Sequence, residues 1–135
     1  MAVGGVESMN YNSSSFDCFV YGATMEEVCD ALVKRFNAEV EIEPGYEDSE
    51  WELTLHGDDG NYMESFITYG TAYGERGVDV CTVFFLGDFH WWANQIFECL
   101  TDALPNDVYM VQNSLDPMFL RERVNGVYSY EELKA

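Results

Sequence analysis

The chain has 135 residues, 47% of them hydrophobic and 16% aromatic, which is enough to build the core of one domain. Its 25 acidic and 6 basic residues give a formal net charge of -19, which excludes nucleic acids and anionic membranes as attractive partners and favours a basic protein surface. No apolar run approaches the ~20 residues of a membrane span and no signal-peptide pattern opens the chain, so we expect a cytoplasmic protein.

The first part of the chain predicts a flexible leader, a strand and a helix. Residues 1–15 contain runs of Gly and Ser without a hydrophobic period, whereas residues 16–135 have the pattern of a single domain. Phe16–Tyr21 is rich in strand-forming residues. A Thr-x-x-Glu capping box then opens a helical pattern of apolar residues, so we predict a helix from about Thr24 to Asn37.

Two stretches of alternating residues predict an antiparallel hairpin with an acidic face. Val40 and Ile42 alternate with glutamates, and Trp51 and Leu53 do so after a turn-forming segment at 44–49. Residues two apart on a strand face are separated by about 6.5–7 Å and adjacent strands by about 4.8 Å, similar to the spacing of nucleic-acid phosphates. We expect the carboxylates of this region to contact a partner: Glu39, Glu41, Glu43, Glu47, Asp48, Glu50, Glu52, Asp58 and Asp59.

The middle of the chain predicts a central strand and a second helix. Asp88 is placed to cap a helix from Phe89 to Ala103, which Pro105 ends. Before this helix we expect, in order, a tight connection at 56–61, a strand at Tyr62–Tyr69, a glycine-rich loop at Gly70–Gly77 and an apolar central strand at Val78–Leu86.

The C-terminal segment fits two structures. Val108–Gln112 predicts a further strand. An Asp-Pro pair at 116–117 and Gly126 have the positions of the start and end of a short helix, whereas Asn125-Gly126 between two valines is typical of a type I′ hairpin turn. We favour the helix, followed by a last short turn that begins at Ser129.

These elements predict an α+β fold in which two principal helices pack on one face of a mainly antiparallel sheet. The other sheet face would then display the glutamates. The four cysteines lack metal-binding spacing and lie in apolar patterns, so we expect free, buried thiols.

The sequence contains no clear catalytic signature. His56 with Asp58 and Asp59 is a candidate metal site, but its spacing matches no common metal-binding motif and a polar turn explains it equally well. Cys81 and His90 lack the local motif of a thiol protease. We therefore expect neither enzymatic activity nor a cofactor.

Aromatic side chains near the acidic region would extend a contact with a basic partner, because their rings stack on guanidinium groups. The candidates are Tyr46, Tyr73 and Trp91. For Trp91, the commoner arrangement of such a residue is packing of the ring edge beneath a loop.

In charge and size the chain resembles small acidic anti-restriction and anti-CRISPR proteins. The resemblance implies a non-enzymatic nucleic-acid mimic that binds the basic nucleic-acid-binding surface of a partner protein. One alternative is an immunity protein that neutralises a basic nuclease toxin. The other is a small cytosolic enzyme or metal-binding protein with a site near His56.

Overall fold

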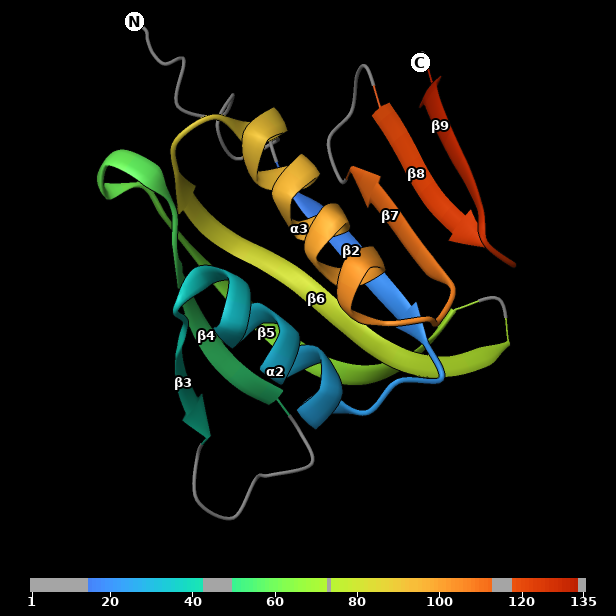
Figure 1. The fold of residues 1–135 in the computed structure, drawn as a ribbon, viewed down its shortest axis with the longest axis horizontal. Coiled ribbons are helices and arrows are strands. Elements are labelled where there is room, and N and C mark those ends of the chain that lie inside the picture. Colours follow the sequence, from blue (N-terminus) through green and yellow to red (C-terminus); the bar gives the residue numbers. More distant parts are fainter. Residues whose placement is uncertain (1–14, 43–49, 73, 113–117, 134–135) are drawn as a thin grey trace, which may run out of the picture.

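The computed structural model describes residues 15–42, 50–72, 74–112 and 118–133, in which two helices cover one face of an antiparallel eight-stranded sheet (Figure 1). This arrangement confirms the predicted α+β class. The helices are α2 (Met25–Phe36) and α3 (Phe89–Ala103). In spatial order the strands are β3 (Glu39–Ile42), β4 (Glu50–His56), β5 (Tyr62–Ala72), β6 (Glu75–Leu86), β2 (Phe16–Tyr21), β7 (Val108–Gln112), β8 (Met118–Val124) and β9 (Val127–Leu133).

Helix α2 begins and ends where its local sequence predicts. The side chain of Thr24 accepts a hydrogen bond from the Glu27 N–H at 3.1 Å, and the Thr24 N–H donates to the Glu27 carboxylate at 3.0 Å. This reciprocal pair satisfies two N–H groups at the start of the helix. Asn37 ends the helix in a left-handed conformation, with φ of 50°.

Helix α3 is capped by residues from two parts of the chain. The Asp88 carboxylate accepts from the His90 N–H at 3.3 Å, as the sequence predicts. At the other end, the guanidinium of Arg123 from β8 donates to the carbonyl oxygens of Thr101 and Leu104, both at 2.6 Å, and to that of Asn106. Arg123 thus supplies the positive charge that the last turn of α3 lacks.

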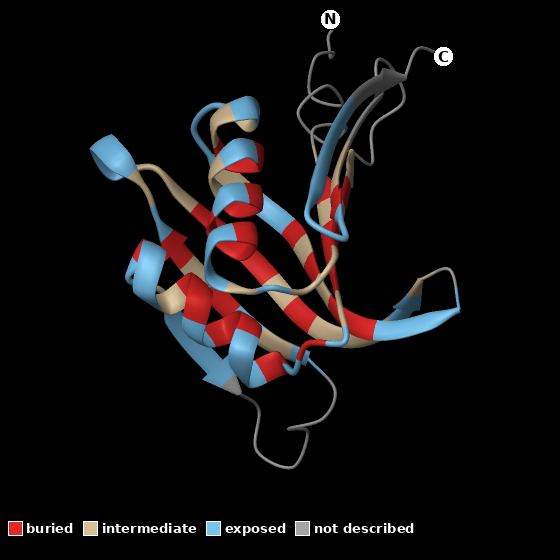
Figure 2. Cartoon of the chain, turned by 45° about the vertical axis from the view of Figure 1, so that its right-hand side comes forward, coloured by how far each residue is buried: buried red, intermediate tan, exposed pale blue. Residues whose placement is uncertain are grey.

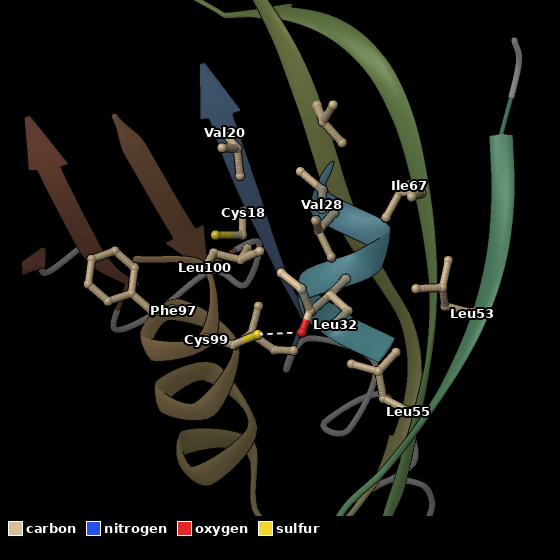
Figure 3. Packing of buried hydrophobic residues seen from close by; sticks show 14 of the residues in the cluster. Cys18, Val20, Val28, Leu32, Leu53, Leu55, Ile67, Phe97, Cys99 and Leu100 are labelled. Carbon is tan, nitrogen blue, oxygen red and sulfur yellow. Dashed lines mark hydrogen bonds between the residues drawn. The ribbon is translucent and has the colours of Figure 1, made fainter. Parts of the chain in front are cut away.

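The hydrophobic core lies between the two helices and the sheet. Figure 2 shows buried residues along the helix sides that face the sheet. The helices approach closely enough for the Cys99 thiol to donate to the Ala31 carbonyl oxygen at 3.3 Å (Figure 3). The largest fully buried side chains include Trp92, Phe16, Phe97, Leu32, Leu53 and Ile67.

Within the described residues, neither helix is long and apolar enough to cross a membrane.

The C-terminal segment is a hairpin, so the favoured helix ending at Gly126 is wrong. Strands β8 and β9 pair on either side of Asn125 and Gly126, which have φ of 53° and 81°. Two successive positive φ angles are the signature of the type I′ turn. Ser129 lies inside β9, so the predicted short turn there is also wrong.

The expected loop at Gly70–Gly77 is wrong as well, because most of it belongs to two long paired strands. Strand β5 continues to Ala72 and β6 starts at Glu75, with Gly70 opposite Gly77. A Cβ at Gly77 would collide with the carbonyl oxygen of Val20 on β2. This glycine allows close approach of neighbouring backbones in the sheet.

Candidate functional site

The sheet has a face opposite the two helices, which we call the open face. Side chains alternate between the two faces of a strand, so the pairing register assigns each residue to one of them. One row of paired open-face residues is Glu41, Glu52, Phe66, Cys81, Asp17 and Val111. The adjacent row is Glu50, Thr68, Asp79, Phe19, Tyr109 and Glu122.

The described lysines and arginines all lie on the helix side of the sheet, which also carries carboxylates such as Glu98 and Asp102. Lys34 and Arg35 belong to α2, where Arg35 pairs with Glu98 of α3 at 3.2 Å. Arg76, Arg121 and Arg123 occupy helix-side positions in their strands. In the described part of the chain, the open face therefore carries carboxylates but no Lys or Arg. Its carboxylates include Glu39, Glu41, Glu50, Glu52, Glu64, Asp17, Asp79 and Glu122.

The densest group of carboxylates surrounds an open groove over β3, β4 and β5. The groove has a volume of about 270 Å³. Phe66 and Val83 contribute apolar surface to it. The glutamates that line it are Glu39, Glu41, Glu52 and Glu64.

The crowding of these carboxylates changes their proton affinity. The pKa of Glu52 is raised by partial desolvation, by a hydrogen bond with the Glu41 carboxyl group, and by repulsion from Glu41, Glu64 and Glu50. Glu41 and Glu52 face each other directly across β3 and β4. A positively charged group bound in the groove would reduce this repulsion, so the electrostatics of the groove favour binding of a cationic group.

A second acidic group lies at the centre of the open face. Asp17 on β2 and Asp79 on β6 each have a buried Oδ1 atom without a hydrogen-bond partner among the described residues. Burial, and then repulsion from Asp17, raise the pKa of Asp79 to about 6. The sequence did not single out these residues. Their signal was an aspartate within an apolar strand pattern, at Phe16-Asp17-Cys18 and Val78-Asp79-Val80.

The structure brings some of the predicted contact residues together and separates others. Glu39, Glu41, Glu50 and Glu52 are exposed and share the open face. Asp58 and Asp59 are exposed in a short 3-10 helix, η1 (Asp58–Gly60), between β4 and β5. Outside the described residues lie Glu43, Tyr46, Glu47, Asp48 and Tyr73.

Trp91 lies on the helix side of the sheet, away from these glutamates. Its ring is half-buried against the core and meets the ring of Trp92 edge-on, with centroids 4.9 Å apart. A Cβ at Gly57 would lie 2.9 Å from the Trp91 ring. This geometry matches the alternative interpretation, in which Trp91 packs beneath a loop.

The candidate catalytic groups do not form a recognisable centre. Within the described residues, no three His, Cys, Asp or Glu side chains are placed to hold a metal ion, and His56 instead contacts Glu39 at 3.3 Å. Cys81 lies on the open face, whereas His90 belongs to α3. Burial, followed by a hydrogen bond with Asp17 and repulsion from nearby carboxylates, raises the pKa of Cys81 to about 12. This thiol would be a poor nucleophile at neutral pH.

No protein-family model, curated protein or solved structure matches this chain.

Proposed function

We propose that this protein is a non-enzymatic inhibitor that occupies the basic nucleic-acid-binding surface of a partner protein. The observation that carries the proposal is the separation of the basic residues from the open face: this face presents glutamates from β3, β4 and β5, and the described lysines and arginines all lie on the helix side. A solvated surface without a binding role has no need for this separation, since mixed charges would stabilise the fold better.

The spacing of the carboxylates supports mimicry of a nucleic acid. Glu39 and Glu41 are two residues apart on β3, and so are Glu50 and Glu52 on β4. In a regular sheet this gives about 6.5–7 Å along a strand and about 4.8 Å between strands. A surface built to bind successive phosphates would meet carboxylates at comparable intervals, and arginine forms bidentate hydrogen bonds with both groups.

The test begins with the double variant Glu41→Lys/Glu50→Lys. Wild type is immobilised, proteins from host cells are captured, and a Lys/Arg-rich protein that it retains is purified. We expect wild type to displace a labelled DNA or RNA duplex from this protein, and the variant to bind it at least about 100-fold more weakly, because two attractive charges become repulsive. The association rate should fall steeply with added salt.

The matched control is Glu26→Lys/Asp30→Lys, which makes the same change in charge at exposed positions of α2. This variant should displace the duplex nearly as well as wild type, because its new lysines lie on the helix side. Circular dichroism checks that both variants are folded. If Glu41→Lys/Glu50→Lys is folded and still inhibits like wild type, the open face is not the inhibitory surface.

A further inference from the structure

An apolar strip borders the acidic groove where β5 and β6 meet. The pairing of these strands shifts at Glu64 and Ser65: Glu64 lies opposite Phe84 and Ser65 opposite Thr82, which leaves Val83 as the extra residue of a β-bulge. The strip consists of Tyr62, Val83, Phe84 and Leu86.

The strip is unusually exposed for apolar side chains within a sheet. Val83 is 53% exposed, Phe84 45% and Leu86 51%. The Phe84 ring lies against that of Tyr62, with centroids 5.8 Å apart. By contrast, the neighbouring residue Phe85 packs toward the core against Phe89. A group of exposed apolar residues beside a polar rim is typical of a protein contact surface.

The groove connects this strip to the glutamates. Val83 belongs to the strip and also lines the groove, together with Phe66 and with four glutamates from β3, β4 and β5. A single bound segment could therefore bury apolar surface against Val83 and Phe84 and place positive charge beside Glu41, Glu52 and Glu64. Pure phosphate mimicry would require only the charges.

We propose that this composite surface receives a segment of the partner protein in which a large apolar side chain is flanked by arginine or lysine. The inference rests on the proposed function and narrows the partner's chemistry. The apolar side chain packs on the strip formed by Tyr62, Val83, Phe84 and Leu86, and the flanking cations meet the glutamates of the groove. Charge complementarity selects a basic segment, and the exposed strip selects one with an apolar centre.

Two fluorescent pentapeptides test this proposal: Arg-Arg-Leu-Arg-Arg and the same peptide with Gly in place of Leu. Their affinities are measured by fluorescence anisotropy at low salt. Wild type should bind the Leu peptide about fivefold or more tightly than the Gly peptide, because the leucine side chain is removed from water. In Val83→Ser/Phe84→Ser the two peptides should bind equally, with the affinity that wild type has for the Gly peptide.

The control Val124→Ser/Val127→Ser removes two exposed apolar side chains at the distant β8–β9 turn and should retain the preference for Leu. Equal binding of both peptides to wild type, a comparison that needs no variant, would overturn the role of the apolar strip and leave the proposed function intact. If neither peptide binds, then both the inference and an electrostatic role for the open face are contradicted.

Discussion

Asp79 occupies a position where an ionised carboxylate is costly to the folded state. Its Oδ1 atom is buried without a described hydrogen-bond partner, and Asp17 lies diagonally across the β2–β6 pairing. Burial and this neighbour raise its pKa to about 6. The folded protein therefore binds a proton at Asp79 more strongly than the unfolded chain does, so stability is lost as the pH rises toward and through 6.

Replacing Asp79 with Asn should therefore stabilise the protein at neutral pH. Asn has nearly the same shape and does not titrate, so the expected gain in the free energy of unfolding is about 1–2 kcal/mol at pH 7.5, after allowing for solvent screening. The gain should shrink toward zero near pH 4, where Asp79 is protonated in the folded wild type. Urea unfolding at both pH values measures the difference.

The exposed carboxylate Glu75, changed to Gln, provides the control for this experiment. It lies on the open face near the β5–β6 turn, where solvent surrounds it. Its replacement should alter stability much less than Asp79→Asn at pH 7.5. If Asp79→Asn gives no gain at that pH, the Asp79 carboxylate is better solvated or better paired than its burial implies.

At the scale of elements, Arg123 joins the C-terminal hairpin to helix α3. Its side chain is only 8% exposed and donates to three backbone carbonyl groups around the end of the helix. Truncation to Ala would remove three hydrogen bonds, one of them buried and two part-buried. We therefore expect Arg123→Ala to lower the free energy of unfolding by about 2–4 kcal/mol, as measured by urea denaturation.

The variant Arg123→Lys separates charge from geometry. Lysine keeps the positive charge near the helix end but has no planar fork to reach several carbonyl groups at once. It should recover only part of the lost stability. Full recovery would mean that the charge alone, acting on the helix dipole, explains the effect of Arg123.

The elements predicted correctly are those defined by their own residues. Helix α2 carries its capping box within Thr24–Glu27, and the hairpin of β3 and β4 carries its alternation within each strand. The elements predicted wrongly depend on contacts with residues far away along the chain. The segment before Gly126 becomes a strand by pairing with β7, and Gly77 lies in a strand because β2 packs closely against it.

The candidate site follows the same rule: the residues placed by local alternation were predicted, and those placed by contacts between distant strands were not. Alternation alone placed Glu39, Glu41, Glu50 and Glu52 on one face. The strand patterns around Asp17 and Asp79 do not place these residues beside the glutamates, because β2 reaches the middle of the sheet only through its pairing with β6 and β7. The apolar strip depends on a β-bulge at Val83, which no local pattern revealed.

For the whole molecule, a formal charge of -19 with acid concentrated on one sheet face means that the folded state contains unrelieved repulsion. Salt screens exposed charges over about 10 Å at 0.1 M ionic strength. We therefore expect the thermal unfolding midpoint at pH 7 to rise by a few degrees between low salt and about 0.2 M NaCl.

The salt effect should become smaller near pH 4, where many carboxylates are neutral, and this provides the internal control. Differential scanning fluorimetry at the two pH values is sufficient. A midpoint at pH 7 that stays constant or falls with NaCl would indicate that the carboxylates repel one another only weakly.

The short edge strand β3 has a consequence for how copies of the protein meet. In the described residues the sheet ends at β3 and β9, and an uncovered edge can pair with the edge of another molecule. Two copies joined antiparallel along β3 would bring Glu39 and Glu41 of each chain next to those of the other, without an intervening cation. We therefore expect the glutamates of β3 to disfavour polymerisation through this edge.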